Sequence, residues 1–227
     1  MNWNIFQRRS LKTRVTLTTL AIFLVGIWLL AFYASRMLRE DMQRLLGEQQ
    51  FSTVSYMAAD INEELDNRLR VLEKIAAGVS PAMLGNAATL QTFLQQLLIL
   101  QEPFNGGIIA YRLDGTAIAE VPLSAGRIGV NYMDIDTIAA ALKDGKSTIG
   151  RPLMGKKLLT PVFGVTVPIR DTQGKVIGAL AGVTDLSKSS FLDVVTDNRY
   201  GKSGGYFLVA RQYRMVVTST DLSLIHI

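Results

Sequence analysis

Two carboxylates lie close together in the segment NYMDIDTIAAALKDG, at Asp134 and Asp136. A pair of carboxylates can hold a cation or act as general acid and general base. The alternative is that one of them caps the helix predicted to follow, with its oxygen accepting backbone N–H groups. The cap is the preferred interpretation, and the cation or acid–base site stays open as the second.

Other catalytic and metal-binding chemistry finds few residues to use. The chain has no cysteine and a single histidine, His226. Triads and zinc sites built on histidine or cysteine therefore have one side chain to draw on. The segments DGKST and YGKSGG end like phosphate loops, but Ala140 and Thr196 stand where such a loop needs its first glycine. We expect no cofactor, no metal and no catalytic residue here.

The only histidine lies in the segment LSLIHI, at Leu222–Ile227. These residues are also what CTG-TCT-CTT-ATA-CAC-ATC encodes, and that string resembles an adapter used to prepare sequencing libraries. The segment is therefore interpreted as an adapter-derived artefact, with the native sequence departing at Asp221. A genuine short strand is the alternative. His226 then has no role in catalysis or metal binding.

The positive charge is concentrated at the N-terminus. The net charge is +5, and residues 1–14 contain Arg8, Arg9, Lys12 and Arg14 without an acidic residue. The rest of the chain is close to neutral and shows no basic face with interleaved aromatic residues, so nucleic acid is not an expected partner.

A long apolar segment follows, VTLTTLAIFLVGIWLLAFY at residues 15–33. As a helix it would be about 28 Å long, close to the thickness of a bilayer core. A cleaved signal peptide is the alternative, but Phe32 occupies a position where cleavage after Ala34 needs a small residue. We expect a retained membrane anchor. The four preceding basic residues favour a cytoplasmic tail at 1–14, which places the residues after Tyr33 outside the cytoplasm.

Helical patterns dominate the next part of the chain, and strand patterns dominate the part after it. Residues 35–79 are predicted to form one long helix with an apolar face at Ile61, Leu65, Leu69, Leu72, Ile75 and Ala76. That face can pack on its own domain, pair with a second copy, or do both.

A second helix is predicted at 87–100 and a third near 136–143. Strands are predicted on both sides of a two-residue turn at Asp114–Gly115, in KLLTPVFGVTVPI and KVIGALAGVTDL, and in the hairpin GGYFLVARQYRMVVTST. The expected fold class is α+β with antiparallel sheets.

The order of these segments resembles that of the double-Cache (dCACHE) sensor domains of bacterial membrane receptors. The stretches that carry the resemblance are RIGVNYMDIDTIAAALKDGKSTIGRP, PVFGVTVPIRDTQGKVIGALAGVTDL and YGKSGGYFLV. The resemblance implies tandem PAS-like modules: a stalk helix at 35–79, a membrane-distal module at 80–186 that holds the ligand pocket, and the start of a truncated membrane-proximal module at 187–221.

One subset of these domains binds amino acids through a known motif, which is incomplete here. Asp185 matches the aspartate that binds the ligand ammonium, but Ile135 stands at the arginine position and Thr137 and Ile138 stand at aromatic positions. An aliphatic side chain does not pair with a carboxylate. Arg127 or Arg151 could bind an anion instead, and Arg151 could equally be a surface residue at a strand edge.

Seven residues are thus candidates for ligand binding: Tyr111, Arg127, Tyr132, Asp134, Asp136, Arg151 and Asp185. Asp185 could alternatively cap the segment at 186–192.

The resemblance predicts extracytoplasmic small-molecule sensing and transmembrane signalling at a bacterial inner membrane. The expected output domain lies outside this sequence and is of the cyclic-di-GMP type, a diguanylate cyclase or phosphodiesterase, with a histidine kinase or a methyl-accepting chemotaxis receptor as alternatives. Expected partners are a small molecule, the membrane and a second copy paired through the stalk helix. Two other classes stay open: an anchored exported enzyme using Asp134 and Asp136, and a structural protein with a coiled-coil stalk.

Overall fold

The computed structural model describes residues 11–97, 103–199, 204–210 and 214–220. Most of the predicted cytoplasmic tail and the LSLIHI segment lie outside these residues. The contacts divide the chain into two units, Met1–Tyr56 and Met57–Ile227. Each unit is described by itself.

The first unit is formed by the N-terminal part of α1, a helix with the bounds Leu11–Ala77. It contains a window of mean hydropathy 2.3 of which no residue is buried. Its large apolar side chains are 63–77% exposed at Phe23, Trp28, Leu30, Phe32 and Tyr33. Apolar groups that no protein atom covers are stable in hydrocarbon and costly in water. The predicted span at 15–33 lies in this stretch, whose length and composition suit a membrane anchor.

The helical layer of the second unit contains the last turns of α1 and two short helices. Leu72 and Ile75 of α1 are buried, and the helix ends before Gly78. Helix α2 (Pro81–Gly85) begins with proline at its first position, where the missing N–H costs nothing. Helix α3 (Ala87–Gln96) is capped by Asn86, whose side chain accepts from two backbone N–H groups. The prediction of a helix from residue 87 is confirmed as far as Gln96.

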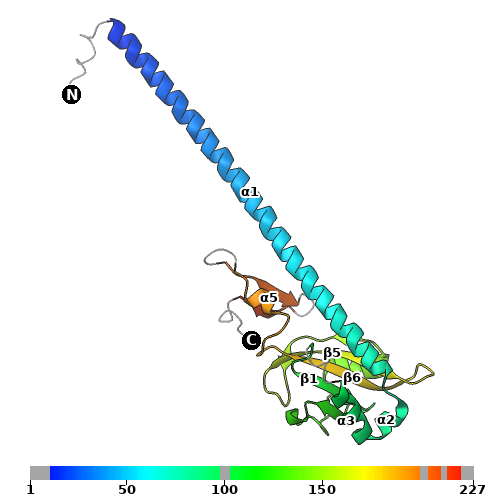
Figure 1. Cartoon of the computed structure of the whole chain (residues 1–227). Helices are drawn as coiled ribbons and strands as arrows, with labels where there is room; N and C mark the ends of the chain where they lie inside the picture. Colours follow the sequence, from blue (N-terminus) through cyan, green and yellow to red (C-terminus); the bar gives the residue numbers. More distant parts are fainter. Residues whose placement is uncertain (1–10, 98–102, 200–203, 211–213, 221–227) are drawn as a thin grey trace. The chain divides into compact units, whose positions relative to one another are not determined.

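One antiparallel sheet forms the centre of this unit (Figure 1). Its strand order is β2-β1-β6-β5-β3, and β4 also pairs with β5. The strands are β1 (Gly107–Tyr111), β2 (Ala117–Val121), β3 (Thr148–Ile149), β4 (Leu153–Met154), β5 (Pro161–Arg170) and β6 (Val176–Asp185).

The connections and the C-terminal part complete the fold. A short 3-10 helix (Leu123–Ala125) follows β2, and α4 (Asp136–Ala139) continues into a π-helical turn (Ala140–Asp144). After β6 come α5 (Asp193–Thr196) and a separate hairpin of β7 (Phe207–Ala210) and β8 (Met215–Ser219). The α+β fold class and this hairpin are confirmed.

The central strands are buried on both faces, so their side chains alternate between two cores. Ile108 of β1 and Leu180 of β6 belong to the core that contains Leu72 and Leu90 of the helical layer. Ile109 of β1 and Ala181 of β6 belong to a second core on the opposite face, together with α4. This period of two is the geometry of a strand. It determines which residues of β1 and β6 can reach the site described below.

The hairpin at Asp114–Gly115 exists, but the prediction of a two-residue loop was wrong. Strand pairing ends at Tyr111 and Ala117. Thr116 instead forms a bridge with Asn131, and its N–H donates to the Asp114 carboxylate at 2.9 Å. A strand partner from further along the chain has therefore widened the loop, and local turn preference could not reveal that partner.

Candidate ligand-binding cavity

A cavity of about 270 Å³ lies on the face of the sheet that carries α4. Its volume is close to the lower end of ligand pockets, which run from about 300 to 1,000 Å³. The apolar part of its lining is Ile109, Ile138, Val162, Ala181 and Val183. Six of the seven predicted residues also line it: Tyr111, Arg127, Tyr132, Asp134, Asp136 and Arg151. The sequence had not shown that these residues, spread over β1 and three connections, share one cavity.

Arg127 is held in the cavity wall by three hydrogen bonds. Its Nε donates to Glu120 Oε2 at 2.7 Å, and its backbone N–H donates to Glu120 Oε1 at 3.0 Å. Its Nη1 donates to the carbonyl oxygen of Gly106 at 2.8 Å. The side chains of Arg127 and Glu120 are 3% and 0% exposed. A guanidinium fixed in this way has one orientation, so the nitrogen that stays free also has a fixed position.

Two buried polar atoms of the lining residues have no hydrogen-bond partner in the part of the chain that the structure describes. They are Nη2 of Arg127 and the hydroxyl oxygen of Tyr132. A buried polar group left unpaired costs about 1–3 kcal/mol, and such groups are rare in folded proteins. Both groups can donate, so an acceptor placed in the cavity would remove this cost.

The two tyrosines that line the cavity pack edge to face, with ring centroids 5.6 Å apart. Burial raises the pKa of the Tyr111 hydroxyl, and the nearby Tyr132 raises it further. Burial likewise raises the pKa of Tyr132, although the positive charge of Arg127 acts in the opposite direction. Both hydroxyls therefore carry their protons at neutral pH, and that of Tyr132 is available as a donor.

Further lining residues form two ion pairs of opposite charge. Lys156 Nζ lies 2.5 Å from Asp134 Oδ1 and 5.1 Å from the centroid of the Tyr132 ring. Arg151 Nη2 lies 4.0 Å from Asp136 Oδ2, with side chains that are 52% and 77% exposed. The hydrogen bond from Lys156 holds the pKa of Asp134 below its usual range. Asp134 is therefore ionised and paired, a state that does not suit a general acid.

The preferred interpretation of Asp134 or Asp136 as a helix cap was wrong. The N-cap of α4 is Ile135, and no side chain makes a capping hydrogen bond there. Asp134 precedes the cap position and binds Lys156 instead, while Asp136 already lies in the first turn.

The positions of the amino-acid motif also lie at this cavity. Ile135 and Ile138 belong to its lining. Thr137 belongs to it as well, and its hydroxyl is hydrogen-bonded to that of Thr166 at 3.2 Å. The positions that hold an arginine and aromatic residues in the amino-acid motif thus carry an apolar and hydroxyl surface here.

Asp185 is not among the residues that line the cavity. It ends β6, is almost fully buried, and accepts from the backbone N–H and the hydroxyl of Ser187 at 3.0 and 2.7 Å. Lys188 Nζ lies 3.6 Å from its other oxygen. Its carboxylate thus stabilises the turn after β6. The predicted role of Asp185 in ligand binding stays a prediction.

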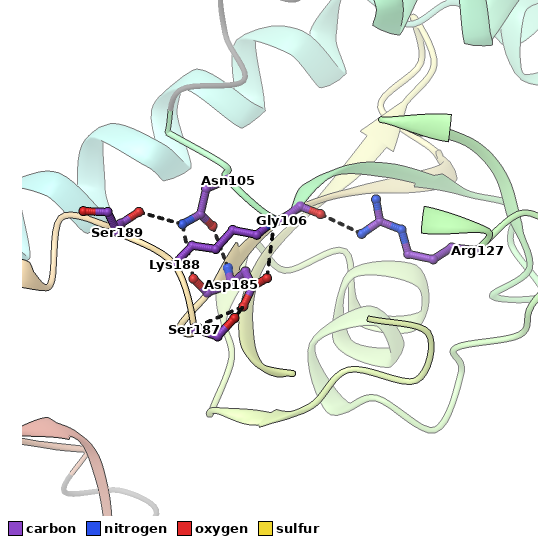
Figure 2. A network of polar contacts seen from close by, with 7 residues as sticks. All are labelled: Asn105, Gly106, Arg127, Asp185, Ser187, Lys188 and Ser189. Carbon is purple, nitrogen blue, oxygen red and sulfur yellow. Dashed lines mark hydrogen bonds and ion pairs between the residues drawn. The ribbon is translucent and has the colours of Figure 1, made fainter. Parts of the chain in front are cut away.

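Asn105 connects the turn after β6 to the cavity wall (Figure 2). Its side chain accepts from the N–H of Asp185 at 2.6 Å and donates to the carbonyl oxygens of Asp185 and Ser189 at 3.2 and 2.9 Å. The next residue, Gly106, accepts from Arg127. Two adjacent residues thus bind the cavity arginine on one side and the exit of the sheet on the other.

Replacing Asp185 with asparagine is expected to lower the free energy of unfolding by about 1–3 kcal/mol at pH 7, because hydrogen bonds to a charged acceptor are lost. Burial acts to raise the pKa of Asp185, but the bonds from Ser187 outweigh it, and the pKa lies below its usual range. The stabilisation is therefore fully present above the unfolded pKa of about 3.9 and disappears as the pH falls through the folded pKa.

Urea unfolding of both proteins at neutral and acidic pH measures this effect. The difference between parent and variant should close in acid, whereas the exposed Asp144→Asn should match the parent at every pH. A difference that persists in acid would mean that Asp185 acts through its shape and not through its charge.

Sequence reasoning missed three residues of this region: Glu120, Lys156 and Asn105. Glu120 left a signal, because it is a single charge within the apolar strand AIAEV. Lys156 and Asn105 left none, since each acts on residues distant in the sequence. Within the described ranges, no cluster of three or more carboxylate or imidazole groups could hold a metal ion.

The sequence matches no protein-family model and no curated protein. The fold, by contrast, is similar to solved structures of sensor domains. An extracellular ligand-binding receptor from Desulfohalobium retbaense matches with a TM-score of 0.63 and 14% identity, over 76% of this chain and 31% of its own. The sensor domain of the V. cholerae histidine kinase DctB matches with a TM-score of 0.63 and 17% identity, over 81% of this chain and 69% of its own.

A third similar structure is the ligand-binding domain of the Pseudomonas fluorescens chemoreceptor CtaA in complex with L-serine. It matches with a TM-score of 0.60 and 18% identity, over 82% of this chain and 76% of its own. At these identities the similarity establishes the fold. The chain has the α+β fold of extracellular, Cache-like sensor domains, and it spans about a third of the D. retbaense chain.

Proposed function

We propose that this chain is the extracytoplasmic sensor part of a bacterial membrane receptor and that the cavity described above binds its small-molecule ligand. The observation that carries the proposal is the cavity itself, because its wall holds two buried polar groups without partners, on Arg127 and Tyr132. The fold supports the proposal, since the similar solved structures are sensor and ligand-binding domains.

The membrane topology is part of the same proposal. The apolar stretch of α1 would anchor the chain in the inner membrane with residues 1–14 in the cytoplasm. Residues 35–79 would form a stalk that pairs with a second copy, 80–186 a distal module with the ligand site, and 187–221 the start of a proximal module. A ligand that favours one arrangement of the distal module shifts the population of that arrangement, and the stalk transmits the shift.

For the cytoplasmic output we propose cyclic-di-GMP turnover, on the basis of the overall resemblance of the sequence to sensors of such receptors. Histidine kinase and chemoreceptor outputs are supported equally by the similar structures. Reading the gene beyond the codon for Thr220 separates these outputs. We expect a second apolar span followed by a GGDEF-type module, and a stop codon at that point would contradict a receptor.

The anchored-enzyme alternative has less support. Its two carboxylates line the cavity, but Asp134 is paired with Lys156, and Arg151 lies near Asp136. A carboxylate pair that works as acid and base needs one member with a raised pKa, whereas the pKa of Asp134 is lowered.

Thermal unfolding of the full chain in detergent micelles, against a panel of anionic, cationic and neutral metabolites, tests the sensing function. A compound that binds the folded state raises the melting temperature by mass action. We expect at least one compound to do so in a concentration-dependent way. If no member of the panel shifts the melting temperature, the cavity is not a ligand site and the sensor function loses its support.

A further inference from the structure

The two unpartnered donors of the cavity are fixed before any ligand arrives. Arg127 is held through Nε, Nη1 and its backbone N–H, which leaves Nη2 without a partner. Tyr132 is 4% exposed, and its ring packs against Tyr111. A group that binds here must accept hydrogen bonds from a cation and from a neutral hydroxyl. A carboxylate does both, and charge-assisted bonds of this kind are the stronger ones.

The charges of the lining residues also favour an anion. Four lining residues are basic, namely Arg127, Arg151, Lys156 and Lys157, whereas two are acidic, Asp134 and Asp136. Glu120 behind Arg127 reduces this positive excess but does not cancel it. The cavity therefore attracts a negative charge.

The cavity offers no unpaired carboxylate to an ammonium group. Asp134 is bound to Lys156 at 2.5 Å, Asp136 has Arg151 at 4.0 Å, and Glu120 is bound to Arg127. Asp185 lies outside the lining, and its oxygens are engaged by Ser187 and Lys188. A buried ammonium without a counter-charge is strongly disfavoured. An α-amino acid would bring such a group with its carboxylate.

The remaining surface suits a short apolar chain. Ile109, Ile138, Val162 and Val183 face the same volume of about 270 Å³. The apolar part of a ligand that enters this volume leaves water for an apolar surface, which is favourable in proportion to the area buried.

From these features we infer that the cavity binds a small organic carboxylate without an α-ammonium group, with its carboxylate between Arg127 Nη2 and the hydroxyl of Tyr132. The inference deepens the proposed sensing function and rests on it. The carboxylate accepts from both donors, and the aliphatic chain lies on the apolar wall.

Three ligands of matched length test the inference: butyrate, butyramide and L-2-aminobutyrate, each titrated into the full chain in detergent micelles by isothermal calorimetry. Butyramide removes the charge and L-2-aminobutyrate adds the ammonium group. We expect butyrate to bind at least about tenfold more tightly than either, since one charge-assisted hydrogen bond changes affinity by about that factor. If either analogue binds as tightly as butyrate, the inference is overturned.

The variant Tyr132→Phe tests the site itself. Because the hydroxyl has no partner in the protein, its removal should leave the melting temperature of the unliganded chain unchanged or raise it. Butyrate affinity should fall about 10- to 100-fold. The control is Tyr56→Phe, which changes a tyrosine that is 79% exposed and should bind butyrate as the parent does. Unchanged butyrate affinity in Tyr132→Phe would overturn the inference.

The double variant Glu120→Gln/Arg127→Gln removes the arginine without leaving a buried carboxylate unpaired, and it should fold and lose butyrate binding. Butyrate binding that persists in this folded variant would also overturn the inference. The outcome of the metabolite panel distinguishes this proposal from the function beneath it. If only neutral or cationic compounds stabilise the chain, the carboxylate is wrong and sensing stands. If no compound of any class does so, both fall together.

Discussion

Replacing Arg127 with alanine is expected to lower the free energy of unfolding by about 3–5 kcal/mol, because a buried ion pair then loses one partner. The carboxylate of Glu120 is fully buried and bonded to Arg127 through both oxygens. It cannot easily move to water, because Gln91 holds the backbone N–H and carbonyl of Glu120 at 3.0 and 2.7 Å. The variant would therefore keep a charge in the core or take up a proton.

Urea unfolding followed by pulse proteolysis measures this loss in the full chain. The double variant Glu120→Gln/Arg127→Gln is the informative comparison, because two neutral amides can bond to each other without leaving a charge. It should retain most of the stability that Arg127→Ala loses. Arg112→Ala changes an exposed arginine and should stay within about 0.5 kcal/mol of the parent. A loss below about 1 kcal/mol in Arg127→Ala would contradict the buried ion pair.

Replacing Gly107 with alanine is expected to cost about 2–5 kcal/mol, since backbone strain and steric overlap both contribute. Gly107 begins β1 with φ of +94°, a conformation that L side chains rarely adopt. A Cβ there would lie 2.2 Å from the carbonyl oxygen of Val121 and 2.8 Å from Arg127 Nη2. The backbone of β2 and the cavity arginine would both have to move.

Gly129→Ala is the matched control. Its φ of +82° carries similar strain, but a Cβ there would meet no atom within 4 Å. We expect a loss of about 1–2 kcal/mol in this variant. The difference between the two variants in the same urea titration isolates the overlap. Equal losses would show that β1 and β2 can separate at this point without cost.

The elements of the fold could largely be predicted, whereas their neighbours could not. Strands β5 and β6 are long runs of β-formers joined by the turn RDTQG, so local pattern was sufficient. The position of β1 between β2 and β6 depends on Gly107 pairing with Val183, far along the chain. The strands β3 and β4 have two residues each and no readable period.

The candidate site divides in the same way. Tyr111, Arg127 and Tyr132 could be chosen by residue type, because buried aromatic residues and arginine are typical of binding sites. Glu120, which fixes Arg127, lies in a strand that is buried on both faces. An alternating pattern marks a strand with one exposed face, and this strand has none. Lys156 pairs with Asp134 across a loop, so only the folded chain shows that the carboxylate is neutralised.

The contacts of Asn105 and Gly106 give the amide proton of Asp185 a particular use. That proton is held by Asn105, whose neighbour Gly106 is bonded to the arginine of the cavity. It can exchange with deuterium only when the bond to Asn105 opens, and local opening of this kind is set by the stability of the surrounding contacts. The exchange rate of one backbone amide at the end of β6 therefore reports how firmly Arg127 is held, without any label in the cavity.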